Sequence, residues 1–310
     1  MTNDVQHTPS IAIIAYEGVQ MSAVLGLSDL FAVANDMSRG SDAAQLECHI
    51  LRPGALSADE RFAVVIVPPN LSDVRGSDDQ DLHSWLGVQH RAGAVLCSAC
   101  AGAFWLGHAG VLDGRPVTTH WTLAELFEQK FPAARLCPEH LLIDDHDIVT
   151  AGGVMAWIDL GLHVIKLYQG AEVVTKTCRH MLIDPAGRAQ EEYRSFRPHL
   201  THKDDAVRQV QLWIEAHPDS ELTLAALAGQ VAMSERSLQR RFTEATGLPV
   251  NRYVQQVRIE KAKGLLERTS LSAAEISWSV GYKDLSSFCR TFKSICGLST
   301  GEYRRRFSVQ

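Results

Sequence analysis

The residues best placed for covalent chemistry lie around Cys100. Residues 98–103 (SACAGA) follow a short apolar run and open a helical pattern. Small neighbours beside a cysteine at a strand-to-helix turn are typical of a nucleophile elbow, whose strained backbone tolerates only small side chains. The positive end of the following helix favours a thiolate. His120, within residues 118–121 (TTHW), is a candidate base.

Two other clusters offer weaker chemistry. Cys97 and Cys100 have the C-x-x-C spacing of thiol redox switches. This interpretation is weakened because Cys97 belongs to the apolar run that precedes the turn. Residues 144–147 place His146 among three Asp, a pattern more typical of a solvated turn than of a metal site. The seven scattered cysteines do not indicate a disulfide framework. We therefore expect no metal ion and no cofactor.

The elements that would position Cys100 alternate between strand and helix. Apolar runs typical of parallel strands covered on both faces occupy residues 11–15, 48–51, 62–67, 94–97 and 148–151. Helical patterns lie between and after them, at residues 22–35, 81–92, 102–109, 123–130 and 155–168. This alternation predicts an α/β domain with a doubly wound, flavodoxin-like parallel sheet. A ligand pocket is expected at the carboxyl ends of its strands.

The last hundred residues contain one pattern twice. Residues 223–242 match residues 272–292, with an offset of 49 before the turn and 50 after it. In each copy a short helical stretch precedes a turn and a second helix. Each second helix is apolar on one face and carries Arg, Lys, Gln or Ser on the other. Two such copies in register predict an all-α domain of two helix-turn-helix units that binds double-stranded DNA.

Charge divides the chain in the same way. Residues 205–310 hold 15 Lys and Arg against 11 Asp and Glu, which is +4, whereas the preceding residues hold 15 against 25, which is −10. We expect an N-terminal domain over residues 1–183, a linker over 184–204 that is rich in charge and contains two prolines, and a DNA-binding domain over 205–310. The N-terminus lacks a signal-peptide pattern and no apolar run approaches a membrane span, so we expect a cytoplasmic protein without a membrane partner.

The last third of the chain, residues 205–307, resembles the DNA-binding module of the AraC/XylS family of transcription regulators. The motifs that carry the resemblance are residues 224–228, 234–242, 247–249 with Tyr253, 274–282, 288–293, and 297–299 with Tyr303 and Arg304. Thr300 departs from the family's usual Pro, at a position that only begins the last helix. The resemblance implies a rigid helix over about 250–266, which would place the two reading helices in successive major grooves.

The same resemblance implies which side chains read DNA bases. They are Arg236, Gln239 and Arg240 in the first unit, and Leu285, Ser286, Ser287, Cys289 and Arg290 in the second. Lys293 shares the outer face of the second helix with Arg290 and completes the expected DNA contacts.

The first half, residues 11–176, resembles the PfpI-like, class I glutamine amidotransferase-like α/β domain. The matching motifs are residues 16–18, 100–103, 110–115, 118–121 and 150–153. The resemblance implies that Cys100 takes the nucleophile position and His120 its partner position. The expected pocket is lined by Cys100, Ala101, His120, Trp121, Gly152 and Gly153.

Three departures from that family indicate a pocket without turnover. Ala23 stands where the hydrolytic members carry an acidic residue, which removes a proton partner for the thiol. Pro69 interrupts the loop that is often Pro-Gly-Gly and has no N–H for an oxyanion. No Asp or Glu is clearly marked as the residue that orients His120. The domain is therefore expected to be catalytically inactive.

Together these patterns predict a transcription regulator whose N-terminal domain senses a small metabolite, such as an amino acid or an amine, in the pocket around Cys100 and His120. The N-terminal domain is also expected to form a homodimer. Trp105, Trp121 and Trp157 are ordinary core residues unless two of them face the pocket, in which case a cationic effector such as an amine becomes attractive. Two alternatives stay open, a regulator with a Cys100-dependent hydrolase or lyase activity and a thiol redox sensor.

Overall fold

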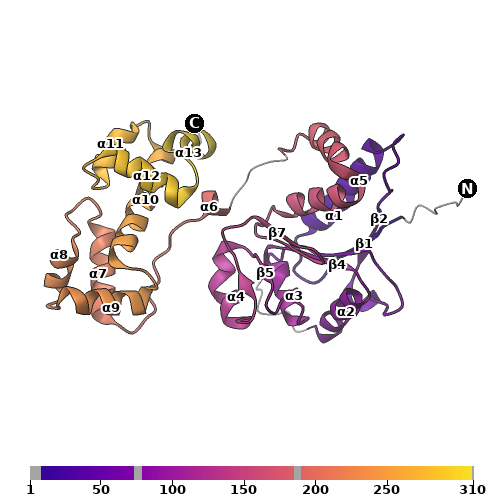
Figure 1. Ribbon diagram of the computed structural model, residues 1–310, viewed down its shortest axis with the longest axis horizontal. Helices are drawn as coiled ribbons and strands as arrows, with labels where there is room; N and C mark the ends of the chain where they lie inside the picture. Colours follow the sequence, from indigo (N-terminus) through magenta and orange to yellow (C-terminus); the bar gives the residue numbers. More distant parts are fainter. Residues whose placement is uncertain (1–7, 73–78, 185–189, 309–310) are drawn as a thin grey trace, which may run out of the picture. The chain divides into compact units, whose positions relative to one another are not determined.

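The computed structural model describes residues 8–72, 79–184 and 190–308 (Figure 1). The chain forms two compact units, Met1–Gln190 and Glu191–Gln310, so the division falls inside the range that was expected to be a linker. Each unit is described by itself. No helix in the described ranges is both long and apolar enough to cross a lipid bilayer.

The N-terminal unit is built on a six-stranded sheet with the order β2-β1-β3-β4-β8-β7. Its strands are β1 (Ser10–Ile14), β2 (Glu47–Leu51), β3 (Val64–Val67), β4 (Val95–Ala99), β7 (Leu142–Asp145) and β8 (Ile148–Ala151). The five strands expected from the apolar runs are present and pair in parallel. This confirms the doubly wound α/β class. The sequence pattern missed β7, which pairs antiparallel with β8, because its half-polar sequence LIDD is not an apolar run.

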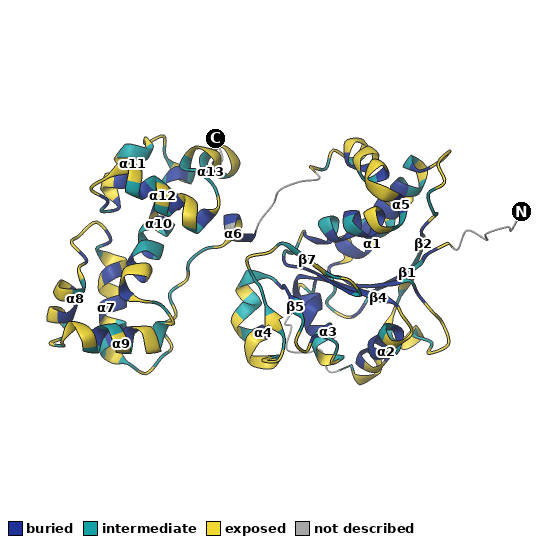
Figure 2. Ribbon diagram, in the orientation of Figure 1, coloured by how far each residue is buried: buried dark blue, intermediate teal, exposed yellow. Residues whose placement is uncertain are grey.

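Helices cover both faces of this sheet (Figure 1). They are α1 (Met21–Met37), α2 (Gln80–Arg91), α3 (Ala103–His108), α4 (Ala124–Lys130) and α5 (Trp157–Met181), and a small second sheet joins β5 (Pro116–Val117) and β6 (Arg135–Leu136). Along β1, Ile11 and Ile13 pack with α1 and α5, whereas Ala12 and Ile14 pack with α2 and α3. The alternation of side chains along a strand therefore gives the unit two apolar layers, and the inner strands β1, β3, β4 and β8 are mostly dark blue in Figure 2.

The C-terminal unit is all-α. After the short helix α6 (Gln190–Tyr193), its helices are α7 (Asp205–Ala216), α8 (Leu224–Gln230), α9 (Glu235–Thr246), α10 (Val250–Arg268), α11 (Ala273–Ser279), α12 (Leu285–Cys296) and α13 (Thr300–Phe307). Two separate apolar clusters form its core, one with α7 to α9 and one with α11 to α13. The first half of α10 contributes Tyr253 and Val257 to one cluster, and its second half contributes Ile259 and Leu266 to the other.

The helix α10 therefore connects the two helix-turn-helix units as one continuous element. It extends the expected range by two residues at its C-terminal end, where Thr269 is the C-cap. A continuous helix that is buried in both cores limits how far the two units can move relative to each other.

Candidate DNA interface and ligand pocket

The first helix-turn-helix consists of α8 and α9. Thr223 begins α8 by accepting a hydrogen bond from the backbone N–H of Ala226, and Ser234 begins α9 by accepting one from Ser237. These hydroxyls satisfy N–H groups that have no partner within the helix. Between the helices, Ala232 adopts a left-handed φ of 51°.

The second helix-turn-helix consists of α11 and α12. Ser272 and Glu275 form a reciprocal capping box at the start of α11, and Asp284 caps α12 by accepting from the N–H groups of Ser286 and Ser287. Its turn contains the one extra residue that the repeat offset predicted. Gly281, at the position that matches Ala232, adopts a φ of 85°.

In each helix-turn-helix the second helix, α9 or α12, buries its apolar face in the core and exposes its polar face to solvent, as the sequence pattern predicts. Leu238 and Phe242 of α9, and Phe288 and Phe292 of α12, are completely buried. On the outer faces, the residues expected to contact DNA are exposed or half-buried: Arg236, Gln239, Arg240, Leu285, Ser286, Ser287, Cys289, Arg290 and Lys293. The Arg236 and Arg290 side chains are thus exposed to a partner outside the unit, whereas the exposed Arg240 guanidinium is paired with Glu244.

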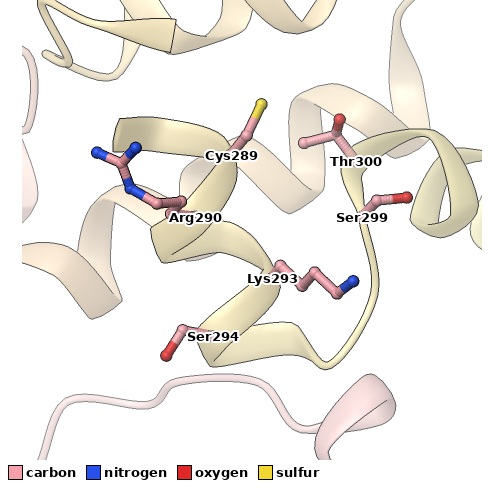
Figure 3. A pocket seen from close by; sticks show the side chains of 6 residues that line it. All are labelled: Cys289, Arg290, Lys293, Ser294, Ser299 and Thr300. Carbon is pink, nitrogen blue, oxygen red and sulfur yellow. The ribbon is translucent and has the colours of Figure 1, made fainter. Parts of the chain in front are cut away.

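A shallow pocket lies between α12 and the start of α13 (Figure 3). Lys293 extends toward the segment that carries Ser299, whereas Arg290 extends away from it (Figure 3). Thr300 is the first residue of α13, as expected. The N–H and hydroxyl of Ser299 both donate to the Glu302 carboxylate, so it is the Lys293 ammonium that favours an anionic group such as a backbone phosphate here.

Other arginines of the unit serve the fold. Arg241 makes two hydrogen bonds to the carboxylate of Asp204, at 2.7 and 2.8 Å, and so joins α9 to the start of α7. Arg304 donates to the carbonyls of Leu266 and Leu271. Their side chains are therefore engaged inside the unit, and the basic sequence at residues 304–306 does not by itself mark a phosphate site.

In the N-terminal unit, Cys100 sits on a strained elbow between β4 and α3. Its φ is 54°, which is unusual for any residue other than glycine. Two residues after Cys100, a Cβ on Gly102 would lie 2.3 Å from the carbonyl oxygen of Val67, so only glycine fits at position 102. The expected nucleophile-elbow conformation is present.

The environment of Cys100 does not favour a thiolate. The residue is only 3% exposed. Burial raises the pKa of its thiol to about 11, although a hydrogen bond from the Ala101 N–H acts in the opposite direction. Ala23, at the position of the missing carboxylate, is completely buried and offers no proton partner.

We expect iodoacetamide to label Cys100 slowly in the folded protein. At pH 7.5 a thiol with a raised pKa holds roughly 100-fold less thiolate than a free cysteine, and labelling should accelerate as the pH rises. Peptide mass spectrometry would measure the rates, with the half-exposed Cys137 as the accessible control. Preferential labelling of Cys100 at neutral pH would contradict the argument.

The Nδ1 atom of His120, the ring nitrogen that accepts, is engaged by Thr122. This Nδ1 accepts the backbone N–H of Thr122 and lies 2.7 Å from the Thr122 hydroxyl, so it caps the turn over residues 121–123. Because Nδ1 accepts, the neutral ring carries its proton on Nε2. Burial also lowers the pKa of His120, which favours that neutral form.

The expected pocket residues Trp121 and Gly152 instead meet Gln190, which sequence reasoning had assigned to the linker. The Gln190 amide nitrogen donates to the hydroxyl of Thr118 and to the carbonyls of Thr119 and His140, at 2.9–3.0 Å. Its amide oxygen accepts from the N–H of Trp121 at 3.1 Å. No local sequence signal distinguishes this glutamine, because all its partners come from distant segments.

Pro69 and the acidic turn also have defined structural roles. The carbonyl of Pro69 accepts from the N–H of Gln20, and Pro69 itself has no N–H to offer an oxyanion. Around His146, the carboxylates of Asp145 and Asp147 pair with Arg115, and Asp144 lies 3.3 Å from His163. The turn between β7 and β8 is thus an ion-pair network.

Comparison with known proteins assigns both units. A helix-turn-helix domain model matches residues 227–306, and the DJ-1/PfpI family model matches residues 46–167. The chain thus combines a region similar to the DJ-1/PfpI family with a region similar to AraC-type helix-turn-helix domains. The two domains are those expected from the elbow motif and from the repeated pattern.

Relatives whose match spans more than two thirds of this chain are named as regulators. The chain is 28% identical to the HTH-type transcriptional regulator ArgR of Pseudomonas aeruginosa, over 70% of this chain and 66% of that protein, which is just under two thirds. It is 29% identical to the HTH-type transcriptional regulator GlxA of Rhizobium meliloti, over 74% of this chain and 71% of that protein. Drosophila melanogaster DJ-1beta superposes with a TM-score of 0.48 and 15% identity, over 57% of this chain and 99% of that one.

Proposed function

We propose that this protein is a sequence-specific DNA-binding transcription regulator whose N-terminal unit senses a small molecule. The observation that carries the proposal is the pair of capped helices α9 and α12, each with a buried apolar face and an exposed basic or polar face. Such a face supplies the donors that read base edges in a major groove. The net charge of +4 on residues 205–310 and the named relatives support the same conclusion.

The N-terminal unit contributes ligand sensing rather than catalysis in this proposal. A buried Cys100 thiol with a raised pKa and a His120 ring turned toward Thr122 do not provide the activated nucleophile that a hydrolase needs. The redox alternative meets a similar obstacle, since Cys97 is completely buried and burial raises the pKa of its thiol. The homodimer through the N-terminal unit remains a prediction that light scattering would test.

DNA binding by the full chain should depend steeply on salt. Each phosphate that the protein neutralises contributes about −0.9 to the slope of log K against log salt, so four contacts lower the affinity roughly 100-fold between 50 and 200 mM. Fluorescence anisotropy on a site selected from a random-sequence pool would measure this slope. Binding that does not change with salt would refute phosphate contact by α9 and α12.

A further inference from the structure

The side chain of Gln190 fills a socket inside the N-terminal unit. The residue is 2% exposed, and four hydrogen bonds satisfy its amide. The socket exists because Gly152 has no side chain, since a Cβ there would lie 1.8 Å from the Gln190 amide nitrogen. A glycine and four polar groups from three separate segments thus surround one amide group.

The chemistry of the socket selects a neutral primary amide. Three oxygen atoms accept from the amide nitrogen of Gln190, and one backbone N–H, that of Trp121, donates to its amide oxygen. A carboxylate would direct its oxygens at the carbonyls of Thr119 and His140, which repel it. An ammonium group would bury a charge without a carboxylate among these partners, which costs several kcal/mol. A carboxamide offers two N–H donors to these three oxygens and a carbonyl oxygen to the backbone N–H.

The residues that follow Gln190 are fixed on the C-terminal unit. The carboxylate of Glu192 pairs with Arg306 at 2.6 Å, and the Tyr193 hydroxyl accepts from the same guanidinium. The carbonyl of Arg194 accepts from the buried ammonium of Lys263 at 2.5 Å. Gln190 is the last residue of its unit, so only one residue separates it in sequence from Glu192.

We propose that this socket is a binding site for the primary carboxamide group of a small ligand, and that Gln190 occupies it until such a ligand displaces it. The inference rests on the proposed sensing function and specifies its ligand chemistry. Displacement would break the four hydrogen bonds of the Gln190 amide, whereas the contacts of Glu192 and Tyr193 within the C-terminal unit do not involve the socket.

Propionamide, the side-chain analogue of glutamine, tests the socket in the full-length Gln190→Ala protein. We expect a saturable rise of the melting temperature with propionamide, because the socket is empty in this variant. The wild-type protein should require at least about tenfold more propionamide, since docked Gln190 leaves the site open only a fraction of the time. Gln190→Glu, in which carbonyls repel the side chain, should respond like Gln190→Ala and serves as the second variant.

Two matched controls decide whether the effect belongs to the socket. N,N-dimethylpropionamide lacks the N–H donors and should give no saturable shift. The double variant Gly152→Ala/Gln190→Ala fills the nitrogen position with a methyl group and should not respond to propionamide. A Gln190→Ala protein that does not respond, or responds equally to both amides, overturns the proposal, as does an unchanged response in the double variant.

The experiment contains no DNA, so its result is independent of the proposed regulatory function. Loss of the propionamide response with intact DNA binding would overturn the socket alone. A normal propionamide response in a protein that does not bind any selected DNA would overturn the proposed regulator and leave the socket in place.

Discussion

Replacing Arg290 with alanine should weaken binding to the selected DNA site by about 1–3 kcal/mol, or roughly 5- to 150-fold, with little loss on random DNA. Arg290 is exposed on α12 and forms no ion pair within the described ranges. A guanidinium in this position can donate two parallel hydrogen bonds to one guanine, and alanine removes both. Competition anisotropy with specific and random duplexes would give the ratio of the two dissociation constants.

Arg240→Ala should act in the same direction with a smaller effect. Arg240 forms an exposed ion pair with Glu244 at 2.9 Å, which must open before the guanidinium reaches a base. Such surface pairs contribute about 0–1 kcal/mol, so the net gain from DNA contact is reduced by that amount. Glu244→Gln is therefore expected to tighten DNA binding slightly.

Arg241→Ala is the matched control on the same helix as Arg240. Because Arg241 is bonded to Asp204, its loss should lower stability but leave the ratio of specific to random binding unchanged. If Arg290→Ala lowered binding to specific and random DNA equally, Arg290 would be a phosphate contact and the base-reading role would be wrong.

Gly281→Ala should destabilise the second helix-turn-helix by roughly 3 kcal/mol. At a φ of 85°, a Cβ would lie 2.7 Å from the carbonyl oxygen of Pro218 and 2.9 Å from the Cα of Asp219. The same carbonyl accepts from Arg258 of α10 at 2.8 Å, so this turn lies where the two helix-turn-helix units meet. The backbone on both sides must shift to admit a methyl group.

Hydrogen exchange on the full chain would measure this loss segment by segment. We expect α11 and α12 to exchange faster in Gly281→Ala, and α8 and α9 to change less. The matched variant is Ala232→Gly, at the equivalent turn position with a φ of 51°. Glycine relieves strain there and should change stability by less than about 1 kcal/mol. Unchanged protection of α12 in Gly281→Ala would show that the turn accommodates a side chain.

The elements that local pattern specifies were predictable from the sequence. Apolar runs identified the five parallel strands, because both faces of a doubly wound sheet are buried. The helical period separated Phe288 and Phe292 from Arg290 on α12, and cap residues such as Thr223 and Ser272 marked helix starts. Small neighbours of Cys100 indicated the elbow that its φ of 54° confirms.

Only the tertiary structure decided which groups meet across long stretches of chain. Gln190 bonds to Thr118, 72 residues away, and no local period records such a contact. The role of Arg241 depends on Asp204, 37 residues away, and the ring orientation of His120 depends on how its turn closes. The apolar periodicity of a strand or helix recurs every few residues, so a short stretch of sequence shows which side chains are buried. Hydrogen-bond partners and pKa values depend on groups that folding alone brings together.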